Sequence, residues 1–124
     1  MKSGIGIALA LTALTTQAPF AHATTSKGLS GDQIDKVVRS HGGQIRACYS
    51  RELERTPGLE GQITIKWTIN AKGNVTSAKV HKTTMNNSRV EDCIVREVQR
   101  MKFPKPEGGN KAVVKYPFGF SKQS

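Results

Sequence analysis

Apolar residues recur every three or four positions between Ser30 and Leu53, which is the period of a helix with one buried face. Ser30 can cap this helix, and Gln33 lies three residues later, so the pair predicts a capping box. Gly42 and Gly43 each cost about 1 kcal/mol relative to alanine and predict a kink or a close backbone approach. The predicted buried stripe consists of Ile34, Val37, Val38, His41, Ile45, Cys48, Tyr49 and Leu53.

The period changes to two at residues 61–70, which predicts a strand with one buried and one wet face. The four residues that share the buried face are Ile63, Ile65, Trp67 and Ile69. Residues 70–74 follow as a hairpin loop in which Gly73 supplies a positive φ. Residues 75–83 return as a second, less regular strand, with Ala78 and Val80 pointing inward.

A second amphipathic helix is predicted to begin near Ser88, because Ser88 and Glu91 have the spacing of a capping box. Its buried stripe consists of Val90, Cys93, Ile94, Glu97, Val98 and Met101. A stiff, proline-containing turn at residues 103–109 ends it, and residues 111–120 read as a third strand. Pro117 cannot donate a ladder hydrogen bond, so this strand is predicted to lie at a sheet edge. The element order is α-β-β-α-β.

The first residues follow the pattern of a signal peptide. Lys2 precedes an apolar run of about eleven residues, and Ala21-His22-Ala23 forms an A-x-A cleavage site. We expect cleavage after Ala23 and export to the periplasm or beyond; the alternative is an uncleaved anchor, which the short run disfavours. The expected organisation is a signal peptide at 1–23, a mobile leader at 24–29, one domain at 30–120 and a tail at 121–124.

The chain of 124 residues carries 19 Lys and Arg against 9 Asp and Glu, a net charge of +10. This balance favours anionic neighbours such as peptidoglycan, lipopolysaccharide or an acidic protein face, although simple solubility explains it equally well. The basic residues are spread along the chain and form no Lys/Arg run, which argues against nucleic acid.

Cys48 and Cys93 lie on the buried stripes of the two predicted helices, which must cover the same small sheet. In an oxidising compartment two cysteines usually pair, so we predict a Cys48–Cys93 disulfide. Its loop of about 45 residues would contribute roughly 4 kcal/mol. Two buried free thiols are the alternative, and a reactive thiol is a third reading that lacks a C-x-x-C motif.

No other pattern supports catalysis, a metal or a cofactor. The spacing of His41 and His81 to the cysteines is unlike that of zinc ligands. Glu52 and Glu54 alternate with arginines, which is typical of a solvated helix face. No nucleophile or phosphate-loop motif is present, so we expect neither an enzyme nor a small-molecule substrate. Trp67 is interpreted as a core residue.

Several motifs together resemble the TonB C-terminal-like domain, in particular the branch named after the AgmX and PglI proteins. They are QIRACYSREL at 44–53, the G-x-I-x-I-x-W-x-I strand at 61–69, the VEDCIVREVQRMKFPKP segment at 90–106 and the closing VKYPFGF at 114–120. The resemblance implies two helices packed on a three-stranded antiparallel sheet in a non-enzymatic envelope protein. It also connects the chain with energy transduction and gliding motility.

In TonB this domain pairs with an extended receptor segment alongside its last strand. The resemblance therefore implies that a peptide segment of an envelope protein or receptor binds here, and strand exchange into a homodimer is a further implied assembly. The edge residues it implicates are Lys111, Val113, Val114, Lys115 and Tyr116. We expect neither a retained membrane anchor nor a Pro-rich spacer, so the binding domain alone is implied. The alternative is a basic structural protein that binds peptidoglycan or lipopolysaccharide.

Overall fold

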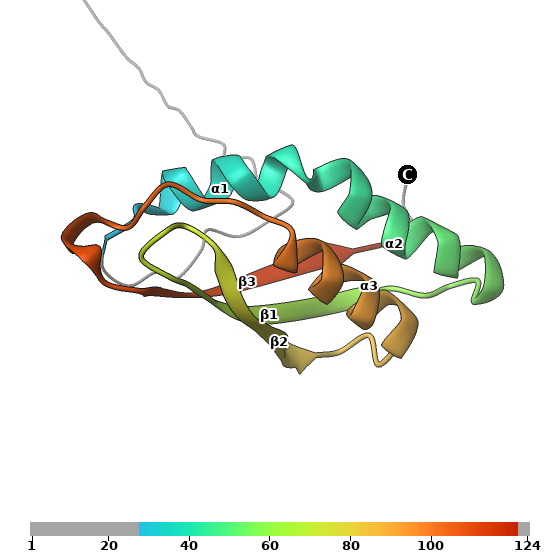
Figure 1. Cartoon of the computed structure of the whole chain (residues 1–124). Helices are drawn as coiled ribbons and strands as arrows, with labels where there is room; N and C mark the ends of the chain where they lie inside the picture. Colours follow the sequence, from blue (N-terminus) through green and yellow to red (C-terminus); the bar gives the residue numbers. More distant parts are fainter. Residues whose placement is uncertain (1–27, 122–124) are drawn as a thin grey trace, which may run out of the picture.

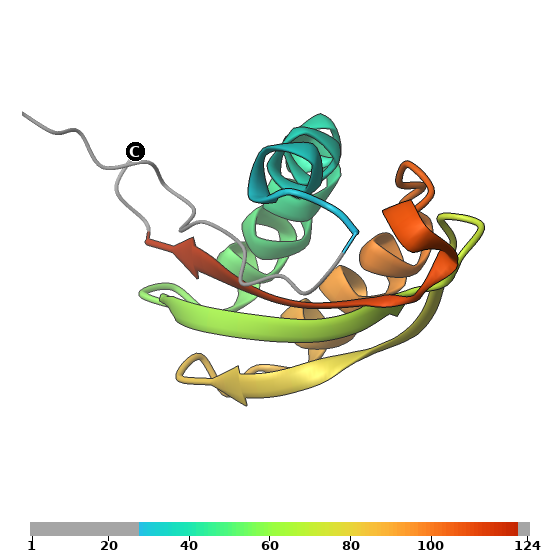
Figure 2. The ribbon, with the colours of Figure 1, turned by 90° about the vertical axis from the view of Figure 1, so that its left-hand side faces the viewer.

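The computed structural model describes residues 28–121, and its three α-helices all lie on one face of a three-stranded sheet (Figures 1 and 2). The sheet is antiparallel with the order β2-β1-β3, which confirms the predicted α+β class. The predicted leader and tail lie largely outside the described residues. The elements are α1 (Gly31–Ser40), α2 (Gly42–Arg55), β1 (Gly61–Ile69), β2 (Val75–Thr83), α3 (Ser88–Gln99), the 3-10 helix η1 (Glu107–Gly109) and β3 (Ala112–Phe120).

The first predicted helix is divided into α1 and α2 at His41, whose φ of −101° and ψ of 9° interrupt the helical path. The capping box of Ser30 and Gln33 is present as predicted. A Cβ added at Gly42 or Gly43 would meet no atom within 4 Å. The kink is therefore confirmed, and the alternative of a close backbone approach at these glycines is wrong.

β1 is the central strand, and its alternating pattern appears in full. Its four inward side chains are completely buried, as the pattern predicts for a strand with one wet face: Ile63, Ile65, Trp67 and Ile69. Gly73 has a φ of +90° in the hairpin loop, and a Cβ there would lie 2.1 Å from the carbonyl oxygen of Phe103. The Phe103 amide donates to the Gly73 carbonyl at 2.9 Å. Glycine is thus required both for the turn and for this backbone contact.

The helices divide the buried face of the sheet between them. α1 and α2 cover β3, where the Tyr116 hydroxyl donates to Asp35 at 2.9 Å and Tyr49 stacks on Phe120 with a ring separation of 5.0 Å. α3 packs against β1 and β2 (Figure 2). None of the helices within residues 28–121 is both long enough and apolar enough to span a bilayer.

The predicted capping box at Ser88 is wrong. The N-cap of α3 is Asn87, which is extended and accepts the Val90 amide through its side chain at 3.1 Å. The Glu91 carboxylate accepts the Asn87 amide at 3.1 Å and the Thr83 hydroxyl at 2.9 Å. An asparagine cap performs the role that spacing alone assigned to serine.

Two glutamates are buried in the helix layer. Glu97, predicted on the inner stripe, accepts from His41 at 2.7 Å and from Arg100 at 3.0 Å, so it ties the α1–α2 junction to α3. Glu52 is only 8% exposed, so its prediction as part of a solvated face is wrong. Asn87 donates to Glu52 at 3.3 Å, which supplies the polar partner that a buried carboxylate needs.

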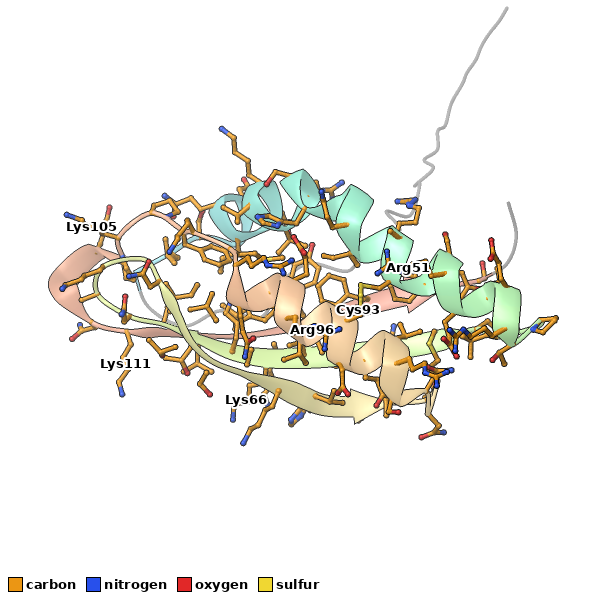
Figure 3. All side chains as sticks on the ribbon, turned by 45° about the vertical axis from the view of Figure 1, so that its right-hand side comes forward. Arg51, Lys66, Cys93, Arg96, Lys105 and Lys111 are labelled. Atoms are coloured by element: carbon orange, nitrogen blue, oxygen red, sulfur yellow. A yellow bond between two sulfur atoms is a disulfide. The ribbon has the colours of Figure 1, made fainter. Side chains whose placement is uncertain are left out.

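A disulfide joins Cys48 on α2 to Cys93 on α3, with a Cα–Cα distance of 5.7 Å, as predicted. Cys93 is partly exposed, and the Arg51 guanidinium donates to its sulfur at 3.3 Å. Arg51, Cys93 and Arg96 lie together where α2 and α3 run side by side (Figure 3). The bond fixes two helices that pack over different strands.

Replacing both cysteines, Cys48→Ala with Cys93→Ala, should lower the free energy of unfolding by about 4 kcal/mol, because the unfolded chain regains the entropy of a 45-residue loop. Urea unfolding followed by circular dichroism measures this. Reduced wild-type protein is the control and should lose a similar amount. An unchanged unfolding midpoint in both samples would show that the bond does not stabilise the fold.

Candidate functional site

The candidate binding edge is β3, the end strand of the described sheet, whose strand neighbour is β1. Pro117 is paired with Thr64 and has no N–H to give, so this is a non-hydrogen-bonded pair of the ladder. Pairs alternate along antiparallel strands, so Lys115, two residues away, belongs to the same class. The main-chain N–H and C=O of Lys115 therefore point away from β1, toward the outer edge of the sheet.

The five predicted edge residues separate onto two faces. Val114 and Tyr116 are fully buried against the helices, so a partner at the edge would reach them through the main chain. Val113 is 38% exposed and Lys115 is exposed, both on the opposite face. Lys111 comes just before the strand, and its side chain points away from the helices (Figure 3). Only Lys111, Val113 and Lys115 offer side chains to a partner.

Tyr116 has a structural role in this edge. Burial, followed by the hydrogen bond to Asp35, raises the pKa of its hydroxyl above the ordinary value. The hydroxyl therefore stays a neutral donor and holds α1 over β3. β3 is thus anchored on its inner side by the helices and on one edge by β1.

The open face is the face of the sheet that the helices do not cover (Figure 2). Lys66 on β1 pairs with Lys79 on β2 and with Lys115 on β3, so three lysines stand in register across the sheet; we call them the lysine row. Lys66 and Lys115 form a non-hydrogen-bonded pair, the closer of the two pair types. Like charges directly opposite each other destabilise a sheet. Lys66 points away from the helices (Figure 3).

Charge is divided unequally between the two layers. Helices α1, α2 and α3 carry seven basic and seven acidic residues, whereas the three strands carry four lysines and no acid. The strand lysines are Lys66, Lys79, Lys82 and Lys115. The ion pairs of residues 28–121 lie in the helix layer and involve Glu52 or Glu97, so none neutralises the lysine row.

His81 on β2 reports the field of the open face. Desolvation, followed by the charges of Lys115, Lys66, Lys82 and Lys79, lowers the pKa of its imidazole below 6.5. Lysines from all three strands are therefore close enough to oppose a further positive charge. An anion on this face would relieve that repulsion.

Sequence patterns place the three lysines of the row on wet positions but not side by side. A β-bulge between Thr68 and Ile69 shifts the pairing of β2 by one residue. Without that shift, Ala78 would stand opposite Lys66 in place of Lys79. The signal that could reveal the row is therefore the bulge, which alternation alone does not predict.

No family model matches the chain, and no curated protein matches it. Among solved structures it is similar to TonB C-terminal domains. The solution structure of residues 179–285 of Helicobacter pylori TonB is 26% identical with a TM-score of 0.48, over 78% of this chain and 87% of that one. The Pseudomonas aeruginosa TonB domain is 25% identical with a TM-score of 0.42, over 61% and 78%. The AgmX/PglI branch stays a prediction.

Lys66→Thr should raise the free energy of unfolding by about 0.5 kcal/mol at low salt, because it removes two like-charge pairs and adds a good strand former. Lys105→Thr, an exposed change in the connection before β3, is the matched control and should have little effect. The increase in the free energy of unfolding should be smaller at high salt, because salt already screens the repulsion between the lysines of the wild type. Destabilisation by Lys66→Thr in urea unfolding would contradict like-charge repulsion in the row.

The lowered pKa of His81 also predicts a pH dependence. Above about pH 6.5 the imidazole is neutral in both states and costs nothing. As pH falls below that value, the unfolded chain takes up the proton more readily, so wild-type stability declines until the folded imidazole is protonated too. His81→Gln should remove this part of the decline. The difference in melting temperature between variant and wild type should grow on acidification; a constant difference would contradict the lowered pKa.

Proposed function

We propose that this chain is a non-enzymatic binding module of the cell envelope, and that it adds an extended segment of a partner protein to the outer edge of β3. The observation that carries the proposal is the direction of the Lys115 main-chain groups at the end strand of the sheet. Main-chain hydrogen bonds supply affinity in this mode of binding, and alternate side chains supply specificity. The expected signal peptide supports the envelope location.

The rest of the fold suits this role. β3 is paired with β1 along nine residues and fixed by Tyr116 and Asp35 on its inner side, so the edge is rigid before a partner arrives. A rigid template reduces the ordering cost of association. The same edge could pair with a second copy of the chain, which is how strand exchange would produce the homodimer implied by the resemblance.

The side chains at the edge favour an acidic segment. On an added strand, the residue opposite Lys115 would continue the lysine row by one position and would stand on the open face. Lys111 adds a further positive charge at the start of the strand, where its side chain points to the same side (Figure 3). An Asp or Glu in the partner would therefore meet unneutralised lysines, whereas a Lys or Arg would be repelled.

The test is selection of extended peptides from a displayed library on the purified full chain. Gly119→Pro removes an N–H that points to the outer edge and leaves the ladder with β1 intact, since Gly119 and Gln62 form a non-hydrogen-bonded pair. We expect this variant to lose the selected peptides, a loss of at least about tenfold in affinity, because each lost main-chain bond costs roughly 1 kcal/mol or more and proline also obstructs the edge.

The matched control is Ala78→Pro, which removes an outward N–H from the opposite edge of the sheet on β2 and should leave peptide binding unchanged. Amide hydrogen exchange gives a second readout: a bound peptide should slow exchange at Lys115 and Gly119. Unimpaired binding to Gly119→Pro, or protection on β2 in place of β3, would exclude strand addition at β3.

A further inference from the structure

The like charges of the lysine row repel one another and destabilise the sheet. The need to keep sheet edges from joining does not account for all three lysines. Lysines on exposed edge strands commonly prevent sheets from joining edge to edge, and this accounts for Lys79 on β2 and Lys115 on β3. Lys66 lies on the central strand, which has no free edge. Solubility needs surface charge, but it does not need three like charges in register, where they repel one another.

The residues around the lysine row confine its positive charge to a narrow band that runs across the strands. The outward rows on either side are uncharged on β1 and β3: Thr68 stands between Ser77 and Val113, and Thr64 stands between Lys82 and Pro117. Neighbouring strands are about 4.8 Å apart, so the row is a band of charge about 10 Å long that crosses the strands. Lys82 and His81 add to it at the β2 side. A narrow band of positive charge matches an extended, linear anionic ligand better than it matches a broad, flat anionic surface.

The type of basic side chain further restricts the class of ligand that the row can bind. All four charges on the strands are lysines, whose flexible stems carry compact ammonium groups that bind phosphate as point charges. Threonine and serine hydroxyls beside the row can donate to further phosphate oxygens. A linear polymer with closely spaced phosphates can contact all three lysines at once and adapt to their spacing.

We propose that the open face binds a linear phosphate polymer, which lies across the three strands along the lysine row, with His81 beside it. This is a second binding surface that does not depend on strand addition at β3. Binding removes the like-charge repulsion within the row, so the ligand stabilises the sheet as it binds.

Short-chain inorganic polyphosphate is the probe, and its affinity for the purified full chain is measured by titration calorimetry at several salt concentrations. Lys66→Thr should weaken binding about threefold to fivefold and lower the slope of log affinity against log salt by about 1. Lys105→Thr, with the same loss of charge elsewhere, should keep the wild-type slope. The triple change Lys66→Thr, Lys79→Thr and Lys115→Thr should abolish binding while raising the melting temperature, which separates lost binding from lost folding.

The position of the ligand is tested by NMR of the histidine rings. Polyphosphate should raise the pKa of His81, which faces Lys66, Lys79, Lys82 and Lys115, by offsetting their charge. The ring of His41, which contacts Glu97 on the helix side, is away from the lysine row, and polyphosphate should leave its chemical shifts unchanged. Gly119→Pro should bind polyphosphate as wild type does, so failure of this proposal and failure of strand addition are distinguishable.

Three results would overturn the proposal. One is wild-type polyphosphate affinity in Lys66→Thr, and another is a pKa of His81 that polyphosphate does not move. The third is tighter, Lys66-dependent binding to polyglutamate or to phosphatidylglycerol vesicles than to polyphosphate, which would assign the open face to an acidic polypeptide or a membrane surface.

Discussion

The arrangement of the whole domain depends on the central strand β1, because its side chains alternate strictly and it pairs on both sides. Its four inward residues, from Ile63 to Ile69, are completely buried, and they require a cover of helices. The chain places all three helices on that one face. The opposite face is then exposed to water, so Lys66 stands in the middle of three strands that carry no acidic residue. One-sided burial thus determines both the core and the charged surface.

Polar contacts fix the positions of the helices relative to one another and to the sheet, which non-directional apolar packing alone would fix less firmly. The Glu97 carboxylate receives hydrogen bonds from His41 and Arg100, and the Tyr116 hydroxyl reaches Asp35. The His41–Glu97 and Tyr116–Asp35 contacts join elements distant in sequence, and both buried acids have a partner, as burial requires. The disulfide adds a covalent link between α2 and α3. The sheet edge at β3 is therefore presented on a support that is fixed at several points.

The sequence predicts the elements whose pattern of apolar residues is local. It does not predict the burial or pairing of residues whose partners lie far away in the chain. Alternation predicts β1 and the inward side of β3, and the paired positions of the cysteines predict their bond. Glu52 was misplaced because its partner Asn87 lies 35 residues away. At the candidate site, the bulge in β2 determines that Lys79 faces Lys66, and no local pattern reveals it. The edge itself follows from Pro117, which cannot donate, so that part of the site is readable from the sequence.

The disulfide has a mechanical consequence for a strand that binds partners. The loop that it closes, from Cys48 to Cys93, contains all of β1 and β2 and the first half of α3. A pull on β3 along the chain can therefore peel β3 from β1 and unravel the segment between Cys93 and β3. It cannot lengthen the enclosed 45 residues while the bond is intact. Under tension applied through a bound partner, the disulfide would thus prevent further extension of the chain between Cys48 and Cys93. The hairpin of β1 and β2 would stay folded, and β3 could pair with it again.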